Sequence, residues 1–444
     1  MSENKRRVLV VDDDAVIRDM AADILSADYE VMEAVDGQDG WEKARSWRPE
    51  LVISDLMMPR MHGYELCKLL RSPEGLGGVK ILVASSKPFA TDKAQAIAAG
   101  ADDYIVKPFP INDLLDKVRK LLSSVTSAPP PPRAAADNPE VTNRSSALAH
   151  PAKPDATLPV FVRFWGTRGS CPTGGAKTVR YGGNTPCTEV RIGDVPLIID
   201  CGTGLRELGG ELNREFAGRP IEGHIFVGHT HWDHIQGFPF FTPLYNPKNT
   251  FTVYSVRGAR SSLRGIFSDS MALDYFPVPL ASLASKLSFV ELEGEVDLGV
   301  AKVSYHHLNH PGVCIGFRIE TQGKVVTYLS DHEGFAKLGG DGEMSRRQDA
   351  AVVEFARGSD LLIKEAQYTE NEYSSRKGWG HATYDDAAAF AAAAGVKRLA
   401  LFHHDPDHTD EIMDSNVKYC RDLLEAGGAK TTCFAAWDGL KIDL

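Results

Sequence analysis

The sequence has its densest group of chemically active side chains at residues 229–234, which read His-Thr-His-Trp-Asp-His. Imidazole nitrogen and carboxylate oxygen are ligands that borderline metals such as zinc prefer. The group directly follows Ile225–Gly228, an apolar run that predicts a buried strand. Because side chains on an irregular turn need not alternate between two faces, the first two histidines can serve one ion, and the aspartate and last histidine a second. A polar loop of hydrogen-bonded histidines is the simpler alternative, but this density of ligands favours metal binding.

The amino-acid composition limits which classes of function the chain can have. The chain has 444 residues, 43% of them hydrophobic and 25% charged, which is typical of a globular protein of two or three domains. No apolar run is long enough to span a membrane, and the N-terminus lacks the apolar core of a signal peptide, so we expect a cytoplasmic protein. Seven scattered cysteines favour free thiols. A net charge of −11 does not favour non-specific binding to nucleic acids, which are themselves negatively charged.

The motif at 229–234 resembles the signature of the metallo-β-lactamase fold superfamily. That resemblance implies an αββα sandwich with one or two metals at the edge of the sheets. The superfamily takes further ligands from later strand ends, and this chain offers His310, Asp331 and His403, each near the end of an apolar, strand-like run. His404 is the adjacent alternative to His403, which is preferred because it directly ends its strand.

The resemblance implies a dinuclear centre with a complete ligand set. The implied ligands of metal one are His229, His231 and His310. The implied ligands of metal two are Asp233, His234 and His403, and Asp331 bridges both ions. Zinc is the expected metal, although His and Asp ligands also suit manganese and iron.

Residues 5–122 alternate between apolar strands and helical segments, which predicts a doubly wound parallel sheet of five strands. Sites in such sheets lie at the carboxyl ends of the strands. Oxygen ligands from three converging carboxylates suit magnesium. The polar residues expected at those ends are Asp12, Asp13, Asp55, Ser85 and Lys107.

This arrangement resembles the receiver domain of two-component response regulators. The matching motifs include Ser54–Pro59 and Lys107-Pro108-Phe109. The resemblance implies that Asp55 is the phosphoacceptor for a cognate sensor histidine kinase and that Asp12 and Asp13 hold magnesium. By the same resemblance, Ser85 and Lys107 contact the phosphoryl group, and Tyr104 is the aromatic switch.

The expected organisation is therefore an α/β chain of two domains. We expect a receiver domain at 1–122, a linker rich in proline and alanine at 123–157, and a metal-dependent hydrolase domain at 158–444. Twelve of the fourteen histidines lie between His224 and His408, which assigns the metal chemistry to the C-terminal domain.

The choice of reaction depends on a later pair of residues. Glu365 ends an apolar strand, and His381 lies just before a helix that residues 383–386 cap as T-x-x-D. The pair resembles the Glu-Ala and His-x-Thr motifs of RNase Z-type phosphodiesterases, in which the histidine acts near the leaving group. A histidine bonded only to the backbone is the alternative. Arg168 and Asn184 are candidates for contacting a substrate phosphate, with a packed, structural arginine as the alternative.

These observations favour a response regulator whose output is a dinuclear phosphodiesterase with Asp233, His381 and Glu365 as catalytic residues. A small phosphodiester such as a cyclic nucleotide is the expected substrate, and a homodimer the expected assembly. The alternatives are an RNase Z-like nuclease for RNA processing, a thioesterase or lactonase of the same fold, and a metal-binding relay without catalysis. The nuclease is disfavoured because residues 158–444 carry 29 basic against 36 acidic side chains.

Overall fold

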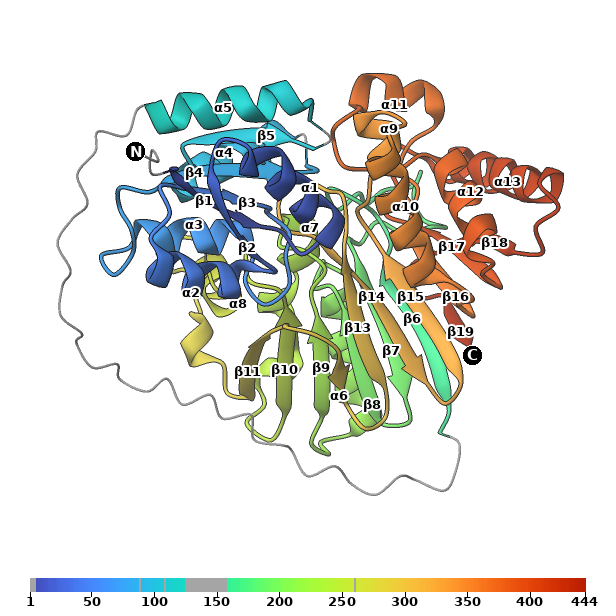
Figure 1. The fold of residues 1–444 in the computed structure, drawn as a ribbon. Coiled ribbons are helices and arrows are strands. Elements are labelled where there is room, and N and C mark those ends of the chain that lie inside the picture. Colours follow the sequence, from blue (N-terminus) through green and yellow to red (C-terminus); the bar gives the residue numbers. More distant parts are fainter. Residues whose placement is uncertain (1–4, 88, 108, 124–157, 259–260) are drawn as a thin grey trace.

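The computed structural model describes residues 5–87, 89–107, 109–123, 158–258 and 261–444, which fold as two α/β domains (Figure 1). The predicted linker, apart from its first residue, and Pro108 lie outside the described residues. Within the described part of the chain, no helix is both long and apolar enough to cross a membrane.

The first domain contains the predicted five-stranded parallel sheet, in the order β2-β1-β3-β4-β5. Its central strands are buried on both faces, because helices cover each side. Its strands are β1 (Arg7–Val11), β2 (Glu30–Ala34), β3 (Leu51–Ser54), β4 (Lys80–Ser85) and β5 (Asp103–Val106). Its helices are α1 (Ala15–Ser26), α2 (Gly37–Trp47), α3 (Gly63–Arg71), α4 (Ala90–Ala99) and α5 (Ile111–Ser123).

The second domain contains two seven-stranded mixed sheets. The first has the order β11-β10-β9-β8-β7-β6-β19, so that the last strand of the chain pairs with the first strand of the domain. Its strands are β6 (Val160–Gly166), β7 (Cys187–Ile192), β8 (Val195–Ile199), β9 (Glu222–Phe226), β10 (Thr250–Ser255), β11 (Lys286–Glu291) and β19 (Lys441–Asp443). The second runs in chain order through β12 (Val296–Asp297), β13 (Lys302–His307), β14 (Ile315–Thr321), β15 (Lys324–Leu329), β16 (Leu361–Glu365), β17 (Arg398–Phe402) and β18 (Thr432–Ala435).

Three apolar clusters define the layers of this domain. One lies between the sheets and joins residues such as Phe226 of the first sheet to Phe317 and Ile363 of the second. A second cluster packs α6 (Leu205–Phe216) and α8 (Leu263–Ser270) on the outer face of the first sheet. A third packs α10 (Glu343–Ala356), α12 (Tyr384–Ala394) and α13 (Asp410–Ala426) on the outer face of the second. The domain is therefore an αββα sandwich, which confirms the predicted fold class.

Short helices and turns complete the second domain and carry several of the site residues. They are α7 (Trp232–Ile235), α9 (Phe335–Gly339), α11 (Glu370–Arg376) and the 3₁₀ turns η1 (Phe238–Phe240), η2 (Thr242–Tyr245) and η3 (Leu280–Ser282). In Figure 1 the first domain, coloured blue to cyan, lies over the end of the sandwich that also carries α7. The two domains thus meet beside the motif at 229–234.

Candidate metal centre

The predicted ligands of metal one lie together at the end of the sandwich. His229 follows β9, His231 precedes α7, and His310 lies in the loop between β13 and β14. Each of the three can offer a ligand atom within 4.8 Å of the others. The Nε2 of His310 is 3.1 Å from the Nδ1 of His231. His231 is exposed, so solvent reaches this group, whereas the other two imidazoles are buried.

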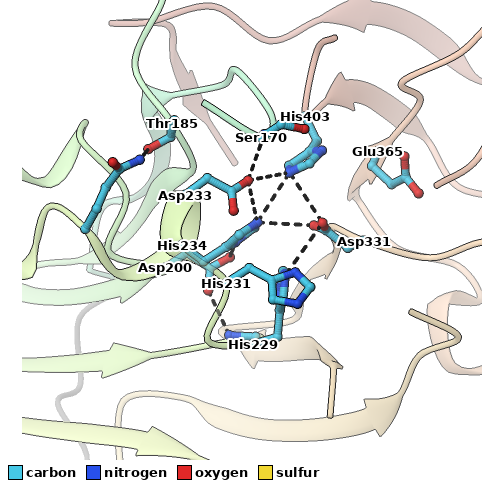
Figure 2. A network of polar contacts seen from close by, with 12 residues as sticks. Ser170, Thr185, Asp200, His229, His231, Asp233, His234, Asp331, Glu365 and His403 are labelled. Atoms are coloured by element: carbon cyan, nitrogen blue, oxygen red, sulfur yellow. Dashed lines mark hydrogen bonds and ion pairs between the residues drawn. The ribbon is translucent and has the colours of Figure 1, made fainter. Parts of the chain in front are cut away.

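The predicted ligands of metal two form an adjacent group, seen in Figure 2. The Nε2 of His403 is 3.1 Å from the Oδ2 of Asp233 and 3.3 Å from the Nε2 of His234. Asp331, directly after β15, lies between the groups: its carboxylate is 3.3 Å from His234 and 3.6 Å from His229. The structure thus brings all seven predicted ligands to one place, from four separate segments of the chain.

Several side-chain atoms in the cluster are buried without a hydrogen-bond partner, although they are strongly polar. Both ring nitrogens of His229 and the Oδ1 of Asp331 are in this state. An unpartnered buried polar group is costly, so atoms of this kind converging on one point fit a bound cation. The donor set, imidazole with carboxylate, suits zinc, manganese or iron.

The electrostatics of the cluster follow from burial and mutual contact. Burial lowers the pKa of His229 and of His310 well below the usual value. Burial alone would raise the pKa of Asp331, but the neighbouring histidines hold it well below its usual value. His234 is the opposite case: burial opposes its charge, yet contact with Asp233, Asp331 and Asp200 raises its pKa well above the usual value.

The geometry bears on two alternatives that the sequence left open. The Nε2 of His404 bonds to the carbonyl oxygen of Ala436 at 2.8 Å, whereas the ring of His403 lies with the other candidate ligands. Arg168 is fully buried and donates to the backbone oxygens of Gly182, Asp405 and His408, so it is the packed, structural arginine.

Sequence reasoning missed the groups that orient the ligands. The Oδ2 of Asp200, at the end of β8, is 2.8 Å from the Nδ1 of His234, and Tyr328 donates to the same oxygen. The Oε1 of Gln367 is 3.2 Å from the Nδ1 of His403. The amide of Ser170 donates to Asp233 at 2.8 Å. Such partners fix ring orientation and tautomer; the available signal for Asp200 was its place at a strand end, as for the ligands themselves.

Glu365 and His381 lie beside the ligand cluster. The Oε1 of Glu365 accepts from the amides of His332 and Ala382, at 2.9 and 2.8 Å. Its Oε2 has no partner and lies 3.8 Å from the Nδ1 of His381, which also has none. The predicted capping box between Thr383 and Asp386 is present.

Burial governs the protonation of this pair. It lowers the pKa of His381 to about 3 and raises the pKa of Glu365 well above its usual value. Burial thus favours the neutral form of both side chains. His381 also lies 3.8 Å from Asp331 and, with His310, could itself hold a metal, which makes it the one ambiguous member of the site.

The receiver places its predicted residues at the carboxyl ends of the strands. Asp12, Asp13 and Asp55 can offer oxygens within 4.8 Å of one another. The ammonium group of Lys107 contacts Asp12 and lies 3.2 Å from Asp55. Burial, with the charge of Asp55, raises the pKa of Asp12 to about 6 and of Asp13 to about 7, although Lys107 opposes both shifts. Crowded carboxylates of this kind fit a divalent cation such as magnesium.

Comparisons with known proteins match two separate parts of the chain. Residues 8–119 match the family model of the response regulator receiver domain, and residues 197–404 match that of the beta-lactamase superfamily domain. Over 151 residues the chain is 34% identical to the DNA-binding dual master transcriptional regulator RpaA of Synechocystis, which covers 34% of this chain and 61% of that protein. Over 121 residues it is 40% identical to the response regulator MprA of Mycolicibacterium vanbaalenii, covering 27% of this chain and 52% of that one.

Two solved structures align with parts of this chain. The metallo-beta-lactamase fold protein YhfI from Bacillus subtilis aligns with 65% of this chain and all of its own, at 18% identity and a TM-score of 0.47. The short form of human tRNase Z aligns with 64% of this chain and 98% of its own, at 21% identity and a TM-score of 0.44.

Proposed function

This chain joins a response regulator receiver domain to a metallo-β-lactamase-fold domain, and from that premise we propose that its output is a dinuclear metal-dependent phosphodiesterase controlled at Asp55. The observation that carries the proposal is the Glu365–His381 pair beside the seven-residue ligand cluster. Hydrolysis of a phosphodiester expels a strongly basic alkoxide, which needs a proton. The leaving group of a thioester or β-lactam has less need of one. A receiver domain suggests signalling, so a cyclic nucleotide is the substrate class we put first.

The ligand residues have distinct roles in this proposal. His229, His231 and His310 would hold one ion, and Asp233, His234 and His403 would hold the other, with Asp331 between them. When bound, the two ions supply an activated water at neutral pH and offset the charge on the leaving oxygen. Asp200 and Gln367 orient the rings of His234 and His403.

Glu365 and His381 supply the proton. The Oε2 of Glu365 passes its proton to the Nδ1 of His381 as the Nε2 of the same ring releases one to the leaving oxygen. The pair loses one proton and the leaving alcohol gains it. A proton from the water that enters the next turnover returns the pair to its starting state. The distance of 3.8 Å between Oε2 and Nδ1 must shorten for this transfer, which a bound substrate can bring about.

The receiver domain implies a phosphodonor such as a histidine kinase. Phosphorylation of Asp55, with magnesium held by Asp12 and Asp13, is the proposed control of the hydrolase. We further propose a homodimer as the working assembly, which sedimentation of the phosphorylated and unphosphorylated chain would test.

The proposal is tested with a panel of esters and the full chain loaded with zinc or manganese. Metal analysis should give about two equivalents in the hydrolase domain. Bis(p-nitrophenyl) phosphate and cyclic nucleotides should be hydrolysed, and a thioester and a lactone should not. Rapid cleavage of the thioester or lactone without phosphodiester cleavage would overturn the proposed substrate class. A preference for RNA over small phosphodiesters would favour the nuclease alternative.

A further inference from the structure

The interface between the two domains has a fully buried charge beside the metal centre. Lys87, between β4 and α4 of the receiver, is 1% exposed. Its ammonium group donates a hydrogen bond of 2.7 Å to the carbonyl oxygen of His310 and another to that of Gly312. A buried ammonium group needs such partners, so this contact is costly to break without replacement by water. A receiver residue thus holds the backbone of a predicted metal ligand.

The ion pairs between the domains are contacts of a different kind. Arg257 lies 3.4 Å from Glu65, and Arg347 lies 3.1 Å from Asp14. The two arginine side chains are 39% and 57% exposed, so water and salt screen these pairs. Unlike these exposed pairs, the contact of Lys87 with the ligand loop is fully buried.

Further receiver groups hold the same loop. Asp92 of α4 accepts from the amide of Gly312 at 3.3 Å and from the hydroxyl of Tyr64 at 2.8 Å. Val313 packs against the apolar core of the receiver. The ring of His310 is held from the other side, because its Nδ1 is 2.8 Å from the carbonyl oxygen of Gly380. A shift of the loop must therefore move the imidazole or break its contact with the hydrolase.

The receiver also forms part of the wall beside the ligands. A cavity of about 230 Å³ is lined by His229 and His231 on the hydrolase side and by Gln95 of α4 on the receiver side. The Oε1 of Gln95 is buried without a partner. The described structure thus places receiver side chains at the approach to the metal centre as well as behind His310.

The backbone of Lys87 is tied to the phosphoacceptor side of the receiver. Its amide donates to the Oγ of Ser85 at 3.2 Å, and its carbonyl oxygen accepts from the hydroxyl of Tyr104 at 2.5 Å. A phosphoryl group on Asp55 would add charge and three acceptor oxygens near Ser85. If the Ser85 hydroxyl moves toward those oxygens, the hydrogen bond that it accepts from the Lys87 amide must change.

We propose that Lys87 is a positioning residue for the hydrolase: it fixes the loop of His310 and connects the phosphoacceptor site to the metal centre. The connection rests on the proposed function, because it concerns the same metal centre and the same control at Asp55. The receiver in its unphosphorylated form holds the loop, and a phosphoryl group on Asp55 loosens that hold.

The test uses Lys87→Met, which keeps the length of the side chain but removes the charge and its donors. Lys93→Met is the matched control, because Lys93 is exposed on the adjacent helix α4. The amides of His310, Gly312 and Val313 should exchange hydrogen faster in Lys87→Met than in the wild type. One of the two metal equivalents should bind about tenfold more weakly, as when a group orienting a ligand is lost. Lys87→Arg should restore both values, and Lys93→Met should leave them unchanged.

The connection to Asp55 is tested by adding beryllofluoride, a phosphoryl mimic, with magnesium. In the wild type the mimic should speed exchange at 310–313 and weaken the same metal equivalent; in Lys87→Met it should add nothing. Equal responses in both chains would overturn the proposal. Unchanged metal binding and exchange in a folded Lys87→Met chain would do the same. These readouts need no substrate, so a chain that shows them without cleaving phosphodiesters would refute the proposed function alone.

Discussion

His381 is the residue on which the proposed reaction depends. If its Nε2 gives the proton to the leaving oxygen, His381→Ala should lower kcat by about 10²–10⁴ with little change in KM. The loss should shrink for a nitrophenyl phosphodiester, whose leaving group is a weak base. Glu365→Gln should show a loss of similar size, because glutamine can orient the ring but has no proton to pass to Nδ1. Steady-state kinetics on good and poor leaving groups provide the measurement.

The same variant also tests the ambiguity between proton donor and ligand. His381, His310 and Asp331 can offer ligand atoms to one ion, so metal content must be measured alongside the rates. Two retained equivalents are expected. If one equivalent is lost, His381 is a ligand; if good and poor leaving groups lose equally, its role is structural.

Asp12 and Asp13 give the receiver a pH-dependent affinity for magnesium. Their pKa values are raised to about 6 and about 7, mainly by burial. The folded state therefore binds these protons more tightly than the unfolded chain, and their contribution to stability is lost as pH rises from about 4 to 7. Magnesium replaces the protons, so its affinity should rise over the upper part of that range.

Calorimetry in buffers of different ionisation enthalpy checks this expectation. Magnesium binding should release about one proton or more at pH 6 and close to none at pH 8.5. Asp13→Asn should remove most of the release, whereas Asp116→Asn, an exposed carboxylate on α5, should not. Release that is independent of pH would contradict the assignment.

At the scale of elements, strand ends were predictable because apolar runs and the polar residues after them are local features. That logic predicted the parallel sheet and, together with the family resemblance, placed His310, Asp331 and His403 in one ligand set. It could not predict the groups that hold the ligands. Asp200 contacts a histidine 34 positions away in the sequence, and neither residue's immediate neighbours indicate the pairing.

Glu333 illustrates how such a group supports a whole segment. It is fully buried after β15 and accepts from the hydroxyl of Tyr373 and from the amides of Gly378 and Gly380, at 2.5, 2.9 and 2.8 Å. Glu333→Gln turns an amide group toward these donors and should lower the free energy of unfolding by about 2–3 kcal/mol. Glu354→Gln, on an exposed ion pair of α10, should change it by less than about 0.5 kcal/mol.

Urea unfolding measures both changes, and metal titration gives a second readout. The segment that Glu333 anchors includes Gly380, whose carbonyl oxygen contacts the ring of His310. Metal binding should therefore weaken in Glu333→Gln and not in Glu354→Gln. Equal stability of the two variants would mean that the segment is held by its other contacts.

At the scale of the molecule, the sequence predicted two domains but not how they dock. The contacts of Lys87 join positions more than 220 residues apart, and no local pattern marks a lysine for that role. Docking nevertheless decides how a signal at Asp55 can reach the metal centre. Direct contact and transmission along the connecting chain are separate routes, and they predict different behaviour when the connection is cut.

Cutting the chain between residues 124 and 157, at an inserted protease site, separates these routes. If docking carries the signal, the two halves should still co-elute at micromolar concentration, and beryllofluoride should still alter hydrogen exchange at 310–313. The response should disappear on dilution, because it then depends on association. Asp55→Ala should remove it in cut and uncut chains alike. If the response is lost on cutting while the halves remain associated, the signal passes through the connecting chain. If the response persists at a dilution at which the halves no longer associate, docking does not carry the signal.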